Sequence, residues 1–241
     1  MVRSFLFVSF LVASSLYLAD GNSVSFITKC KAEDTKCIKE NAERAIPILA
    51  SGIPELGVDS LDPVILEKVD ASSQNLKLLL TNVKATGLKS CKVKKVKRDI
   101  AKSKIFMKVI CSLEVTAHYD MSGQILLLPI KGQGPAKVTL PKAVFAADCN
   151  MENIKKSDGT HWHIKDWKHT YELQEKSTLV FENLFDGNEV LAKAANDVIE
   201  SSTNEIILEI GGPLVHAMMR KVMDNINQFY KAVPGEELAL D

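Results

Sequence analysis

A run of strict alternation in the middle of the chain constrains the fold more than any other feature. Nine consecutive odd-numbered positions are apolar, and polar side chains predominate at the even positions between them. The apolar set is Ile105, Met107, Val109, Cys111, Leu113, Val115, Ala117, Tyr119 and Met121. Because side chains along a strand point alternately to its two faces, the pattern predicts one long strand with a dry and a wet face. Such a strand would be roughly 55 Å long at about 3.3 Å per residue, so we expect strong curvature or bulges.

A second long element follows near the end of the chain, from Glu189 to Tyr230. Its apolar residues recur every three or four positions, which is typical of a helix. The stripe comprises Leu191, Ala195, Val198, Ile206, Ile210, Leu214, Ala217, Met218, Val222, Ile226 and Phe229. Asn188 can cap its start, and Gly211-Gly212-Pro213 predicts a bend midway. At about 1.5 Å per residue the helix would reach roughly 60 Å, which matches the long strand.

These two elements determine the predicted architecture. A helix of this length cannot bury its stripe on a small core, whereas a long curved sheet wrapped around it would supply the missing partner. Further predicted elements are a helix over 34–50 and strands over 76–83, 90–98, 124–130, 136–146, 160–167 and 170–180. Short polar links between them, such as Lys131-Gly132-Gln133-Gly134, favour an antiparallel meander. We therefore predict an elongated, single-domain α+β fold with an internal apolar tunnel between helix and sheet.

The N-terminus predicts a secreted protein. Residues 5–19 are uncharged and mostly apolar, and Ala19 and Gly21 form a small-x-small cleavage pattern, so we expect a signal peptide over 1–21 and a mature domain over 22–241. The apolar stretch is too short to be an integral membrane segment. The chain has 30 basic and 30 acidic residues, and this zero net charge argues against nucleic acid as a partner. We expect a monomer.

All five cysteines lie in the predicted mature chain, where an oxidising compartment favours disulfides. Cys91 and Cys111 each lie ten residues from Ala101, so a hairpin centred there would place them opposite each other on adjacent strands. The alternative is that they are buried free thiols, because a bulge near Val96 would shift the register. Cys149 stays unpaired in either case.

Other candidate chemistry is weak. His161 and His163 share one face of a predicted strand and His169 lies nearby, but no third zinc ligand is identifiable by spacing, so we favour an ordinary strand face. Neither a nucleophile elbow nor a zinc-protease motif occurs, and we expect no catalytic residue, no metal and no cofactor. Five basic residues between Lys92 and Arg98 suit either an anionic partner or a solvated edge strand, and we favour the edge strand.

Several short motifs, in order, resemble the insect takeout and juvenile-hormone-binding protein family. The features are Cys30 with Cys37, Gly52-Ile53-Pro54-Glu55-Leu56-Gly57 followed by Leu61-Asp62-Pro63, the alternating region, Asn183-Leu184-Phe185-Asp186-Gly187-Asn188, and the long C-terminal helix interrupted by Pro213. The resemblance covers essentially the whole predicted mature chain.

The resemblance implies one long helix wrapped by a highly curved sheet, like half of a bactericidal/permeability-increasing protein, with a tunnel for lipophilic molecules. It implies secretion into haemolymph or sensory fluid, and a disulfide between Cys30 and Cys37. The absence of any cysteine after Cys149 favours the takeout branch over juvenile-hormone-binding proteins proper.

Together these features predict a secreted, non-enzymatic carrier of a small or long-chain lipophilic ligand, such as a terpenoid hormone or a fatty-acid-like molecule. The alternatives are a secreted protein-interaction module without a ligand and, less favoured, a hormone esterase. From the dry faces of the long strand and the helix we nominate six ligand-binding residues: Val109, Leu113, Val115, Tyr119, Leu214 and Met218.

Overall fold

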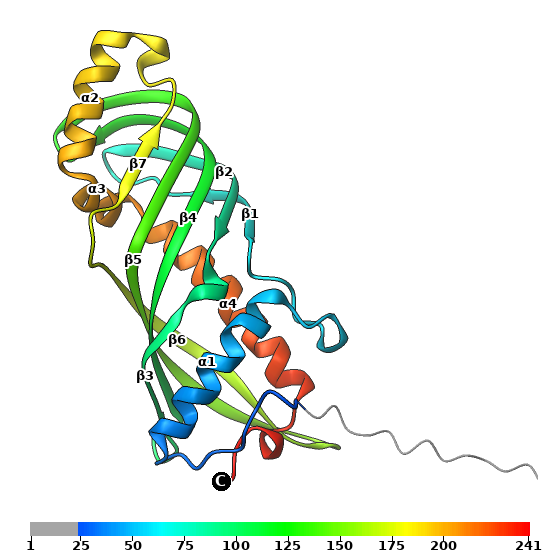
Figure 1. The fold of residues 1–241 in the computed structure, drawn as a ribbon. Helices are drawn as coiled ribbons and strands as arrows, with labels where there is room; N and C mark the ends of the chain where they lie inside the picture. Colours follow the sequence, from blue (N-terminus) through cyan, green and yellow to red (C-terminus); the bar gives the residue numbers. More distant parts are fainter. Residues whose placement is uncertain (1–23) are drawn as a thin grey trace, which may run out of the picture.

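The computed structural model describes residues 24–241, so the predicted signal peptide lies outside the described residues. The molecule is elongated, and two long curved strands run along most of its length (Figure 1). One end carries α2 (Glu189–Ser201) and α3 (Thr203–Ile210). The other end carries α1 (Thr35–Ser51) and the C-terminus, with α4 (Gly212–Ala232) crossing between the two ends. The α+β fold class is confirmed.

A single antiparallel sheet of seven strands forms the body of the protein within the described residues. The strands are β1 (Val64–Asp70), β2 (Leu76–Thr86), β3 (Lys92–Asp99), β4 (Lys104–Ile125), β5 (Leu128–Lys156), β6 (Gly159–Leu173) and β7 (Thr178–Phe181). The order is β1-β2-β4-β5-β6, with β3 also paired to β4 and β7 also paired to β5. The predicted long strand is confirmed as β4, which has 22 residues, and its partner β5 has 29.

Each long strand is bordered by two shorter ones, and the register shifts where curvature is needed. On one side of β4, β3 pairs with its first part and β2 with its second part. Register shifts occur between Thr81 and Lys84 in β2, between Val93 and Lys95 in β3, and opposite Ser112 of β4. Because a bulge bends its strand and increases the local twist, these irregularities allow the sheet to curl around α4.

The C-terminal helical region bends as predicted and also breaks at a second place. α3 ends at Ile210 and α4 begins at Gly212, which confirms the interruption at Gly211. The break at Ser202, where φ is −123° and ψ is 31°, was not predicted. α2 and α4 consequently run in different directions (Figure 1). Asn188 caps α2 by accepting a hydrogen bond from the Leu191 amide at 3.1 Å, as expected.

Several sequence-based boundaries were wrong. The predicted link Lys131-Gly132-Gln133-Gly134 is not a turn, because β5 runs through it and the chain turns at Leu126-Leu127 instead. A side chain at Gly132 would lie 3.0 Å from the Asn183 carbonyl, and one at Gly134 would lie 2.8 Å from the Glu182 carbonyl. These glycines permit the segment after β7 to approach β5 closely, which is another reason for glycine within a strand.

The other differences concern strands that the sequence-based prediction missed, ended too early or divided at the wrong place. β1 was not predicted, and β5 extends to Lys156 rather than ending at residue 146. The two strands expected over 160–167 and 170–180 are one strand, β6, followed by the short β7. All four of these elements are nevertheless antiparallel to their neighbours, as the meander prediction requires.

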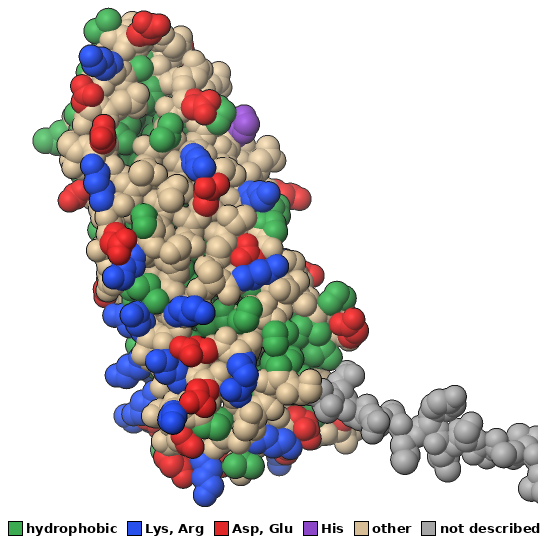
Figure 2. All heavy atoms as spheres, in the orientation of Figure 1, with side chains coloured by type: hydrophobic (Ala, Val, Ile, Leu, Met, Phe, Trp, Pro, Cys, Tyr) green, Lys and Arg blue, Asp and Glu red, His purple; other side chains and the backbone are tan. Residues whose placement is uncertain are grey.

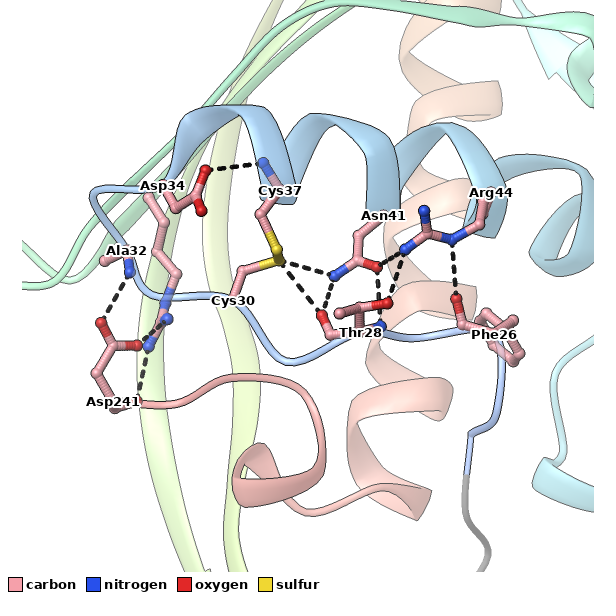
Figure 3. Close-up of a disulfide and its surroundings, with 10 residues drawn as sticks. Phe26, Thr28, Cys30, Ala32, Asp34, Cys37, Asn41, Arg44 and Asp241 are labelled. Atoms are coloured by element: carbon pink, nitrogen blue, oxygen red, sulfur yellow. Dashed lines mark hydrogen bonds and ion pairs between the residues drawn. A yellow bond between two sulfur atoms is a disulfide. The ribbon is translucent and has the colours of Figure 1, made fainter.

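Two disulfides tie the chain at the end that carries α1. Cys30–Cys37 joins the segment before α1 to its first turn, with the two Cα atoms 5.8 Å apart (Figure 3). Asp34 caps α1 between them by accepting a hydrogen bond from the Cys37 amide at 3.0 Å. Cys91–Cys111 joins the start of β3 to β4, with Cα atoms 4.3 Å apart. Cys149 is buried and unpaired, as expected.

Candidate ligand-binding cavity

A cavity of about 410 Å³ lies between the concave face of the sheet and the helices α1 and α4. Its volume falls within the range of about 300–1,000 Å³ that is typical of small-molecule sites. Aliphatic, aromatic and sulfur-containing side chains make up almost all of its lining. None of the helices within residues 24–241 is long and apolar enough to cross a membrane.

Five of the six nominated residues line this cavity. Val109, Leu113 and Val115 contribute from β4, and Leu214 and Met218 contribute from α4. The structure brings these two groups together because α4 packs along the inner face of the sheet, so both dry faces meet the same space.

Tyr119 is not among the residues that line the cavity. Its ring packs edge-on against Phe181 with centroids 4.8 Å apart, and its hydroxyl donates to the Glu182 carbonyl at 2.6 Å. Burial, with smaller contributions from Asp186 and Glu182, raises the pKa of this phenol to about 12. Tyr119 therefore helps to hold the segment after β7 against β4.

α1 contributes a cavity wall that the nominations did not include. Its inward face presents Ile38, Ala42, Ala45, Ile46 and Leu49, which recur at helical spacing. The same helical spacing is visible in the sequence. However, spacing alone does not show whether the apolar face of a helix lines a cavity or packs directly against other side chains.

β5 contributes a wall whose residues could not be nominated from alternation. Ala136, Val138 and Leu140 line the cavity from even positions, whereas Phe145, Ala147, Cys149 and Met151 line it from odd positions. Leu140 pairs with Leu113 and Ala143 pairs with Cys111, so two residues of β5 lie opposite Ser112 alone. This bulge moves the inward face from even to odd positions.

Few polar side chains reach the lining, and they gather at the end near the C-terminus. Asn41 bonds internally, because its amide donates to the Thr28 carbonyl and to Cys30 Sγ and its oxygen accepts from the Thr28 amide (Figure 3). Arg98 pairs with the Asp241 side chain and donates to the Asp241 carbonyl at 3.1 Å. Its guanidinium also stacks over Trp162, 4.5 Å from the ring centroid.

Cys149 and Met223 place two sulfur atoms on the cavity wall. Cys149 Sγ lies 4.0 Å from Met223 Sδ. Burial raises the pKa of the Cys149 thiol to about 11, and the carboxylates of Asp148 and Asp166 add to the shift. The thiol is therefore protonated at neutral pH and acts as a small apolar group there.

The histidines considered as zinc ligands have separate environments. His161 is buried, with Nδ1 2.9 Å from the Tyr230 carbonyl and Nε2 3.2 Å from Asp158 Oδ1. His163 Nε2 lies 3.9 Å from Glu152 Oε1. His169 packs near His216, with ring centroids 5.5 Å apart. Over residues 24–241, no three histidine, cysteine or acidic side chains converge on a common point.

The basic run lies on β3, which pairs with β4 alone among the described strands. Val93 and Val96 are buried, while the lysines of the run are exposed. Lysine and acidic side chains are interspersed on the face shown in Figure 2. This arrangement fits the edge-strand interpretation, except that Arg98 turns toward the cavity end.

Fold and cavity together define a class of protein: a strongly curved antiparallel sheet that encloses an apolar cavity against packed helices. The model of the haemolymph juvenile hormone binding protein (JHBP) family matches residues 6–240, and the chain belongs to this family. It is a family of proteins that bind hydrophobic ligands.

Three relatives are similar over different shares of the chain. The crystal structure of Takeout 1 from Epiphyas postvittana superposes with a TM-score of 0.85 and 28% identity, covering 88% of this chain and 99% of that one. The circadian clock-controlled protein daywake of Drosophila melanogaster is 25% identical over 224 residues, which is 88% of this chain and 86% of the relative. A putative beta-carotene-binding protein of Schistocerca gregaria is 27% identical over 112 residues, which is 45% of each chain.

Proposed function

We propose that this protein is a secreted, monomeric, non-enzymatic carrier that binds one lipophilic molecule reversibly in the cavity between α1, α4 and the sheet. The observation that carries the proposal is the cavity of about 410 Å³ with an almost entirely apolar lining. Removal of apolar surface from water contributes about 25 cal/mol per Å² before the costs of association are subtracted. Terpenoids and long-chain lipids present the most such surface for their volume.

The comparisons support the same proposal. The family is described by the binding of juvenile hormone, and one relative is described as a putative beta-carotene-binding protein. Both descriptions name elongated apolar molecules. The predicted signal peptide and the two disulfides support secretion, because disulfides persist in oxidising compartments.

A cavity-blocking variant tests the proposal. Ala117 lines the cavity from β4, whereas Thr116, its neighbour, is exposed on the other face of the same strand. We expect Ala117→Trp to lower the affinity for an apolar fluorescent probe at least tenfold, because the indole occupies the ligand's space. Thr116→Trp is the matched control and should bind as the wild type does.

The assay starts from folded protein that has been extracted with organic solvent, and the extract is analysed by mass spectrometry. Thermal unfolding of both variants establishes that they fold. Lack of saturable probe binding by the folded wild type would refute the carrier and favour an interaction module. Equal binding by wild type and Ala117→Trp would place the ligand elsewhere.

A further inference from the structure

The end of the cavity near the C-terminus differs from the rest because it carries a phenol with no partner. Tyr230 lies in the last two turns of α4, lines the cavity, and packs edge-on against Trp162 with centroids 5.6 Å apart. Its hydroxyl makes no hydrogen bond within residues 24–241. Over the same residues, Ser177 Oγ is the one fully enclosed side-chain polar atom without a partner, so the Tyr230 hydroxyl faces accessible space. Tyr230 lines the cavity, and the two groups that affect the pKa of its hydroxyl, Cys149 and Arg98, line it too, so we take that space to be the cavity.

The groups around this hydroxyl leave no free charge. Burial, reinforced by Cys149 and opposed by Arg98, raises the pKa of Tyr230 above its ordinary value. The phenol is therefore a neutral donor. The Arg98 side chain is 14% exposed and already paired with Asp241, so its charge is compensated.

A second pocket of about 610 Å³, with several charged residues in its lining, adjoins this end from outside. The two spaces share five wall residues: Arg98, Ile105, Met151, Trp162 and Ala239. The outer pocket is lined by charged side chains, among them Lys29, Lys104 and Glu152. An amphipathic ligand in the cavity would therefore have its polar end next to polar and charged side chains and its apolar part against α1 and the sheet.

We propose that Tyr230 binds the polar head of the ligand, and that this head is an uncharged oxygen group, such as an alcohol, ester, ketone or aldehyde. The proposal rests on the carrier function and specifies its ligand class. A pure hydrocarbon would leave the buried phenol without a partner, which costs binding free energy. A carboxylate would lie beside a neutral phenol and an arginine that Asp241 already neutralises, so its charge would gain no ionic partner at this site.

Four ligands with one chain length separate these cases: tetradecan-1-ol, methyl tetradecanoate, tetradecane and tetradecanoic acid. Affinities come from displacement of an apolar fluorescent probe at pH 7.5. For the wild type we expect the alcohol and the ester to bind about tenfold more tightly than the alkane, which corresponds to about 1.4 kcal/mol for one buried hydrogen bond. The free acid should bind more weakly than the alcohol.

The variant Tyr230→Phe removes the hydroxyl and keeps the ring. In this variant the alcohol should lose its roughly tenfold preference over the alkane, because the alcohol loses its hydrogen bond and the alkane no longer leaves a hydroxyl without a partner. Tyr171→Phe is the control, because Tyr171 lies outside the cavity lining and its hydroxyl donates to backbone carbonyls of α3 at 3.3 and 3.4 Å. This control should change none of the four affinities, and thermal unfolding checks that both variants fold.

The outcomes separate the two proposals. If none of the four ligands displaces the probe from the wild-type protein, this result would count against the carrier function itself. If wild type binds them but Tyr230→Phe keeps the same preference for the alcohol over the alkane, the carrier stands and the head-group site is refuted. Tightest binding of the free acid would refute the uncharged head.

Discussion

Cys91 and Cys111 lie opposite each other because a bulge between Val93 and Lys95 changes the pairing of β3 with β4. Near the turn, Asp99 pairs with Lys104, so this end of the hairpin is centred between Ala101 and Lys102. Beyond the bulge, Lys92 pairs with Ile110, which centres the ladder on Ala101 and places Cys111 against Cys91. The bulge therefore creates the register that the disulfide needs.

Removal of this disulfide should destabilise the protein substantially. It closes a separation of 20 residues, for which restriction of the unfolded chain contributes about 3 kcal/mol. The double variant Cys91→Ala/Cys111→Ala should unfold roughly 6–12 °C lower in a thermal scan, given about 2–4 °C per kcal/mol at this size. Peptide mapping without reduction checks the pairing. Free thiols at both positions, or an unchanged unfolding temperature, would contradict the assignment.

Two adjacent glycines at the start of α4 should respond in opposite ways to alanine. A Cβ at Gly211 would lie 2.5 Å from the Ile207 carbonyl oxygen, whereas one at Gly212 would meet nothing within 4 Å. Gly211→Ala should therefore cost about 1–3 kcal/mol through displacement of the backbone. Gly212→Ala should raise stability by up to about 1 kcal/mol, because alanine restricts the unfolded chain more than glycine does.

Urea unfolding of the two variants beside the wild type measures both effects. Equal free energies of unfolding for Gly211→Ala and Gly212→Ala would show that the chain can bend at residue 211 without close approach to α3.

The attachment of the C-terminal segment should weaken in acid. The pKa of the Asp241 carboxyl is lowered from 3.8, first by a hydrogen bond from the Ala32 amide at 2.8 Å and then by Arg98. The pKa of the Glu236 carboxyl is lowered from 4.5 by hydrogen bonds from its own backbone amide and from the Thr160 amide. A pKa lowered by folding gives stabilisation that is complete above the unfolded value and is lost as pH falls through the folded value.

We therefore expect hydrogen exchange over 235–241 to increase as pH falls from about 5 to about 3, after correction for the intrinsic exchange rate. Asp241→Asn should show faster exchange there at pH 6 and a smaller change on acidification. Protection that is independent of pH in the wild type would contradict the assigned role of these carboxylates.

The sequence predicted the features that depend on unbroken periodicity. The alternation from Ile105 to Met121 identified β4, and the helical stripe identified the region that forms α2 to α4. Five of the six residues nominated from their dry faces line the cavity, and their contact with a ligand stays a prediction. Tyr119 continues the same alternation but lies past the cavity, because residues after β7 cover that part of β4.

What the sequence could not supply depends on bulges and on contacts between distant segments. The one extra residue of β5 opposite Ser112 reverses which positions face inward, and no local sequence pattern predicts this reversal. Gly132 and Gly134 were interpreted as turn residues, but they lie within β5, where the absence of a side chain lets the segment after β7 pack closely against the strand. Tyr230 lies one residue past Phe229, the last residue of the predicted stripe, and only the packing of α4 on β6 shows that it lines the cavity.

Cys149 offers a direct chemical report on the cavity. The other four cysteines are in disulfides, so an alkylating reagent can label one position in the folded protein. Its thiol lines the cavity, is 6% exposed, and has a pKa of about 11. At pH 8 only about one molecule in a thousand carries the reactive thiolate.

Iodoacetamide should therefore label Cys149 in folded, ligand-free protein far more slowly than in guanidine-unfolded protein at pH 8. The rate should rise about tenfold per pH unit up to about pH 11, because the thiolate is the reacting species. A ligand that fills the cavity should slow labelling further, whereas it should leave the unfolded control unchanged. Mass spectrometry of the intact protein follows the reaction. Labelling at the unfolded rate would show that Cys149 is open to solvent, and labelling indifferent to a bound ligand would place that ligand away from the wall that Cys149 shares with Met223.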